Sequence, residues 1–147
     1  MKLPKKKKIQ EIDPKNLSEP DLTDLQSRIF IRGIELFNSR KFWEAHEAWE
    51  EVWKLREEES RIFFQGVIQA AAGYHLLLVK RRYGGTINNF DKALSKLGLF
   101  PSRFLGIDVG ALRKALRESK TIAVRLGAER LGDFPDSGIP TLIQIPQ

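Results

Sequence analysis

The sequence contains no cysteine among its 147 residues. This absence excludes a disulfide scaffold, a thiolate zinc site, a cysteine-ligated iron–sulfur cluster and a cysteine nucleophile. The chain also has little excess charge beyond its first residues. Its net charge is +6, and five of the 25 Lys and Arg residues lie within residues 2–8, so the remaining basic residues exceed the 19 acidic ones by one. Such a basic segment is weak support for nucleic-acid binding.

Targeting and membrane signals are also missing. No apolar segment follows the N-terminal lysines, so the pattern of a secretory signal is absent. The most apolar stretch, residues 62–79, has the length of a membrane span but contains Gln65, Gln69 and His75. We therefore expect a buried helix of a bundle, no membrane insertion and a cytoplasmic location.

The apolar residues that are present recur at steps of three and four, which predicts helices. The expected helices span about residues 21–37, 41–56, 62–79, 86–99 and 109–126, with N-caps at Asp21 and Asp108. Gly84 and Gly85 are expected to form a left-handed turn, and no strand pairs are expected. The sequence thus predicts an all-α, single-domain bundle of about five helices. Its expected parts are a mobile lysine-rich arm at 1–20, a helical domain at 21–128 and an extended tail at 129–147.

The two histidines lie in the most apolar and aromatic of these helices. His46 and Glu50 are four residues apart, so they lie on one helix face, and His75 lies on the next helix. Two imidazoles and one carboxylate are the ligands of open zinc and non-heme iron sites. We therefore predict a pocket in which His46, Glu50 and His75 bind zinc, iron or manganese. The expected surroundings are Trp53 as a wall and Glu47 and Gln69 as outer groups.

Other interpretations of the same residues stay open. If the two helices pack antiparallel about the middle of the link that joins them, His46 and His75 are offset by about 6 Å along the helix axis. The buried histidine then serves only as a structural partner of Glu50, or as an acid–base group that Glu50 orients without a metal. Glu50 replaces the second histidine of the metalloprotease helix motif, and the Glu-x-x-His spacing of di-iron bundles is absent. Neither a peptidase nor a ferritin-like oxidase is expected.

Two kinds of partner are alternatives to an enzyme. Arg113, Arg117 and Lys120 share a face of the expected fifth helix, and with residues 80–82 and the lysine arm they predict a surface for RNA or DNA. The competing interpretation is an ordinary solvated face. Trp43 points away from the expected core and is a candidate contact for a protein partner.

Three blocks of sequence resemble a known family. They read FWEAHEAWEEVWK, RIFFQGVIQAAAGYHLL and FPSRFLGIDV. These blocks, within about residues 28–118, are similar to the family known as domain of unknown function 309. That family is described by a His-x-x-x-Glu-x-x-Trp/Tyr motif proposed to bind metal, which here falls on His46, Glu50 and Trp53. The resemblance implies an all-helical fold and favours the metal site, but it implies no activity.

Overall fold

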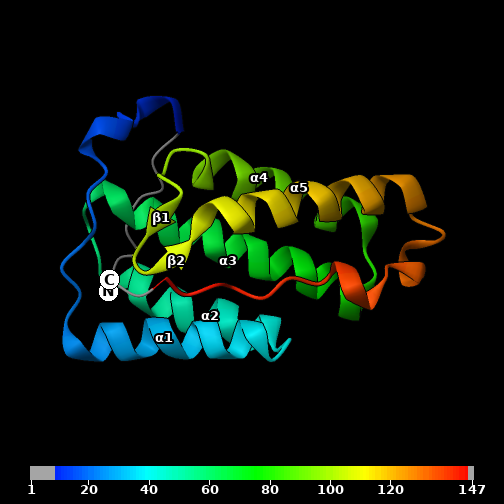
Figure 1. The fold of residues 1–147 in the computed structure, drawn as a ribbon, viewed down its shortest axis with the longest axis horizontal. Helices are drawn as coiled ribbons and strands as arrows, with labels where there is room; N and C mark the ends of the chain where they lie inside the picture. Colours follow the sequence, from blue (N-terminus) through cyan, green and yellow to red (C-terminus); the bar gives the residue numbers. More distant parts are fainter. Residues whose placement is uncertain (1–8, 146–147) are drawn as a thin grey trace.

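The computed structural model describes residues 9–145 and has five α-helices. They are α1 (Asp24–Asn38), α2 (Phe42–Lys54), α3 (Ile62–His75), α4 (Tyr83–Leu97) and α5 (Val109–Leu126). The short strands β1 (Arg103–Phe104) and β2 (Ile107–Asp108) form an antiparallel hairpin between α4 and α5 (Figure 1). The predicted all-α bundle is confirmed, and the hairpin is a small element that the sequence analysis did not expect.

Helix α3 is the centre of the bundle. It packs against α2 on one side and α4 on the other, while α1 packs on α2 and α5 on α4. Phe63, Phe64 and Tyr74 are fully buried and join an aromatic core that α1 and α2 complete. The segment Glu59–Lys80 is apolar and long enough to cross a membrane, but 67% of its most apolar window is buried inside the structure. Burial of this extent is what a central helix of a bundle requires.

The predicted ends of two helices are wrong. Helix α1 begins after Thr23 rather than Asp21, because Thr23 and Gln26 cap each other in a reciprocal box. Gly84 and Gly85 lie within the first turn of α4, and the left-handed residue is Arg81, with φ of 52°. A π-helical turn, Leu76–Lys80, precedes it. A side chain at Gly85 would collide with Leu76, so this glycine permits close packing rather than a turn.

Both segments outside the helices pack on the bundle. Residues 9–16, which belong to the predicted arm, contain two short 3₁₀ turns, and Ile12 between them is buried. The rest of the arm, residues 1–8, lies outside the described residues. Residues 139–145 run extended beside α1, where the Asn38 side chain bonds both backbone groups of Leu142. The same segment bonds to the hairpin through Ile145 N–H and Gly106 C=O, at 2.8 Å (Figure 1).

Candidate functional site

A polar cleft of about 470 Å³ lies between α2, α3 and α4. Helix α2 places His46, Glu50 and Trp53 at its wall because these positions recur at steps of four and three. The neighbouring stripe of α2, which includes Phe42, Ala45 and Trp49, is buried in the core and fixes the rotation of the helix. Gln69 of α3 and Lys92 of α4 line the facing walls.

His46 and Glu50 form the titratable pair of this cleft. His46 Nε2 lies 3.4 Å from Glu50 Oε1, and the two side chains are 15% and 39% exposed. Burial lowers the pKa of His46, whereas Glu50 and Glu47 raise it and His75 lowers it again; the net result is a lowered pKa. The imidazole is therefore neutral at pH 7, and Glu50 favours the tautomer that is protonated at Nε2.

Two residues that line this cleft carry a buried nitrogen atom without a hydrogen-bond partner among the residues that the structure describes. The two atoms are Nδ1 of His46 and Nε1 of Trp53. Trp49 provides the contrast, because its Nε1 donates to the carbonyl oxygen of Phe30 at 3.1 Å. Buried polar atoms are nearly always bonded to protein or water, so an unpaired one needs a specific explanation.

The structure does not bring His75 to the cleft. The ring of Trp43 stacks on His46 with 4.5 Å between centroids, and it also contacts the ring of His75 at 5.1 Å. The imidazoles of His46 and His75 thus contact the same indole ring. Burial and Lys80 lower the pKa of His75, while Glu44 raises it, and the net shift is downward.

These positions do not fit a metal ion held by three protein ligands. Within residues 9–145, no three side chains of His, Asp or Glu are grouped in a way that would hold one. His46 and Glu50 are adjacent, but the third predicted ligand, His75, contacts the ring of Trp43 and does not line the cleft. Metal binding by this chain stays a prediction.

Gln69 and Glu47, the predicted outer groups of the pocket, lie in different surroundings. Gln69 lines the cleft, and its Oε1 accepts a hydrogen bond from Lys96 Nζ at 2.7 Å. Glu47 is exposed and affects His46 through its charge. Lys54, Asn89 and Lys92 also line the cleft and were not predicted from the sequence. Lys54 lies four residues after Glu50, which is a signal of a shared face, but only the packing of α4 on α3 reveals the other two.

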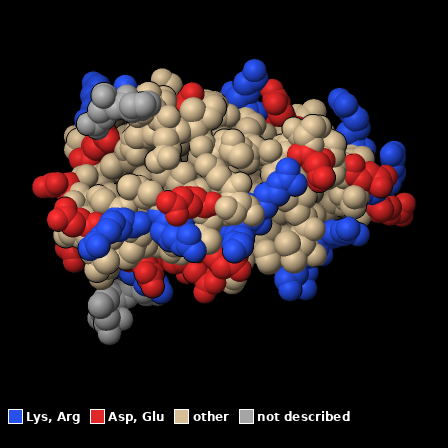
Figure 2. All heavy atoms as spheres, turned by 60° about the horizontal axis from the view of Figure 1, so that its bottom comes forward, with Lys and Arg blue, Asp and Glu red and all other residues tan. Residues whose placement is uncertain are grey.

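Several basic residues of the predicted nucleic-acid surface have partners within the protein. Arg113 donates to the carbonyl oxygens of Leu97 and Phe100, and Lys120 pairs with Asp91 at 2.6 Å. On the side of the molecule where α1 lies, which Figure 2 brings forward, acidic and basic side chains are interspersed as well. The internal partners of Arg113 and Lys120 favour the interpretation of an ordinary solvated surface.

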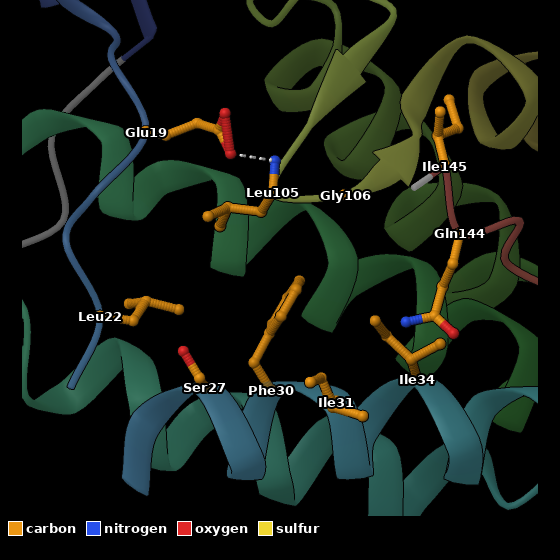
Figure 3. Close-up of a pocket in the computed structure, with 10 residues that line it drawn as sticks. All are labelled: Glu19, Leu22, Ser27, Phe30, Ile31, Ile34, Leu105, Gly106, Gln144 and Ile145. Atoms are coloured by element: carbon orange, nitrogen blue, oxygen red, sulfur yellow. Dashed lines mark hydrogen bonds between the residues drawn. The ribbon is translucent and has the colours of Figure 1, made fainter. Parts of the chain in front are cut away.

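A second cleft, of about 460 Å³, lies between α1, the hairpin and residues 144–145. Phe30 and Ile34 form its floor, and Leu105 faces them from the hairpin (Figure 3). Glu19 accepts the backbone N–H of Leu105 at 2.8 Å. The lining is mostly apolar and contains no pair of titratable groups, so the polar cleft is the better candidate for chemistry.

The comparisons with known proteins concern the segment that contains His46, Glu50, Trp53 and His75. Residues 30–88 match the family model described as "Domain of unknown function (DUF309)". An uncharacterized protein of Aquifex aeolicus (strain VF5) is 33% identical over 101 residues, which cover 68% of this chain. The match spans only 28% of that longer protein. The chain therefore carries a domain of the DUF309 family, over residues 30–88.

Proposed function

We propose that the polar cleft binds a small molecule and that His46 is its acid–base group, oriented by Glu50. The observation that carries this proposal is the buried Nδ1 of His46, which has no partner among the described residues. It belongs to an imidazole whose other nitrogen faces a carboxylate at 3.4 Å. General-base catalysis uses this arrangement, in which a carboxylate lies beside one nitrogen of an imidazole and the other nitrogen is unpaired.

The chemistry follows from the protonation of His46. Because its pKa is lowered, the ring is neutral at pH 7 and has a lone pair on Nδ1. That atom accepts a proton from a hydroxyl or a bound water. Glu50 then stabilises the imidazolium that results, since its carboxylate raises the pKa of His46. An imidazole that accepts a proton and then releases it can serve as base and as acid.

The competing interpretation is a structural His–Glu pair, and stability measurements separate the two. We expect His46→Phe to leave the free energy of unfolding unchanged or to raise it. The phenyl ring keeps the stacking on Trp43, and the substitution removes an unpaired buried nitrogen, which is worth about 1–3 kcal/mol. Trp49→Phe is the matched control, because it removes an indole N–H that is bonded, and it should destabilise the protein. A loss of more than about 1 kcal/mol in His46→Phe would show a structural pair.

NMR titration of the histidines tests the role of Glu50, and metal analysis of the same protein preparation tests the predicted metal. The two histidines give separate ring signals in NMR spectra, and His75→Gln assigns them. We expect the pKa of His46 to lie below its ordinary value and to fall further in Glu50→Gln, because that carboxylate raises it. Stoichiometric zinc, iron or manganese that survives dialysis and disappears in His46→Ala would instead establish a metal site and overturn the metal-free proposal.

A further inference from the structure

Two side chains of the cleft, Trp53 and Gln69, present hydrogen-bond donors. Trp53 is only 7% exposed, and its Nε1–H has no acceptor within the described part of the chain. Gln69 uses its Oε1 to accept a bond from Lys96, so its amide nitrogen is oriented as a donor. The missing partner at this wall is therefore an oxygen acceptor.

The charged residues of the lining also favour an oxygen acceptor, and one that is negatively charged. Lys54 of α2 and Lys92 of α4 line the cleft from two sides, and Lys96 binds the lining residue Gln69. Among the described residues that line the cleft, Glu50 supplies the carboxylate, and it lies against His46. Two ammonium groups from different helices, together with a buried N–H donor, favour a negatively charged ligand.

We propose that the cleft binds a small organic anion with a carboxylate or phosphate group near Lys54, Lys92 and Trp53, and with a hydroxyl near His46. The inference rests on the proposed function, because it names the ligand class of the same site. A volume of about 470 Å³ lies within the range of small-molecule sites, which is about 300–1,000 Å³. The hydroxyl is the group whose proton the unpaired Nδ1 of His46 would accept.

The indole N–H signals provide a direct test on the full chain. The three tryptophans give three such signals in a ¹⁵N-labelled protein, and Trp53→Phe identifies the one that matters. We expect lactate or inorganic phosphate to move the Trp53 signal in a saturable way, while glycerol, which is neutral, does not move it. The tighter of the two anions identifies the group as a carboxylate or a phosphate. Failure of both to move the signal overturns the anion proposal.

Lysine variants test the assigned partners. We expect Lys54→Ala with Lys92→Ala to weaken anion binding at least about tenfold, the effect of losing charge-assisted hydrogen bonds. Lys114→Ala is the control, because Lys114 is an exposed lysine of α5 outside the cleft. Equal affinities in the double variant and the control would show non-specific attraction and overturn the proposal.

Failure of this inference is distinguishable from failure of the proposed function. If anions leave Trp53 unaffected while His46→Phe remains stable and His46 titrates low, only the ligand class is wrong. If anions bind but His46→Phe unfolds easily, the cleft is an anion site with a structural histidine, and the acid–base proposal is wrong.

Discussion

The indole of Trp43 lies nearly parallel to the imidazole of His46, with an angle of 12° between the rings. Trp43 is itself 45% exposed, so it forms a partial cover over His46 on the solvent side. The same ring contacts His75. One surface residue thus contributes to the burial of both histidines.

Removing this cover should change how the histidines titrate. In Trp43→Ala we expect the pKa values of His46 and His75 to rise toward 6.5, because burial is the largest cause of their lowering. NMR titration of the ring signals measures both values. Trp43→Phe retains an aromatic ring and should shift them less. Unchanged pKa values in Trp43→Ala would show that other groups bury the histidines.

The stability of the protein should depend on pH through the same residues. In the unfolded chain a histidine takes up its proton near pH 6.5, while in the folded protein His46 and His75 resist protonation. The unfolded state therefore binds more protons below this pH, and the free energy of unfolding falls as the pH drops from about 7 through the folded pKa values. Urea unfolding of the wild type, His46→Phe and His75→Phe at a series of pH values measures this. Each variant should lose part of the slope, and identical slopes in all three would contradict the prediction.

Gly33 of α1 should tolerate no side chain. A Cβ at this position would collide with the indole of Trp49, which lies against the helix and donates to Phe30. We expect Gly33→Ala to lower the free energy of unfolding by about 1–3 kcal/mol or more, the range for overpacked cores. Gly84→Ala is the matched control, because nothing lies within 4 Å of the added atom and the site is helical. It should be neutral or stabilising by up to about 1 kcal/mol. Thermal or urea unfolding distinguishes them.

A buried hydrogen bond joins α3 to α5. The hydroxyls of Tyr74 and Ser119 are 2.7 Å apart, and both residues are inaccessible to solvent. Tyr74→Phe leaves the Ser119 hydroxyl without its partner, so we expect a loss of about 1–3 kcal/mol. In the double variant with Ser119→Ala, part of that loss should be recovered. Strictly additive effects in a double-mutant cycle would mean that the two groups are not coupled.

The sequence predicted the helices well because their apolar periodicity is strong. The core-facing stripe of α2 and the burial of α3 follow directly from that periodicity. The helix ends were less predictable. The reciprocal cap of Thr23 and Gln26 competes with the nearby Asp21, and the left-handed backbone at Arg81 occurs at a residue type that rarely adopts it.

The candidate site was predictable only along a single helix. The spacing of His46 and Glu50 fixes them on one face, and the structure places them in contact. The relation of His46 to His75 depends on how two helices are rotated, and the ring of Trp43 contacts both imidazoles. Lys92 enters the cleft from α4, at a distance in sequence that no local pattern indicates.

The two hydrogen bonds between Asn38 and Leu142 have a consequence for synthesis on the ribosome. The two residues are separated by 104 positions in the chain. At a translation rate of roughly 5–20 residues per second, Leu142 is made about 5–20 s after Asn38. During that time the Asn38 side chain has water in place of these two partners, so residues 139–145 can pack beside α1 only after Leu142 has been made.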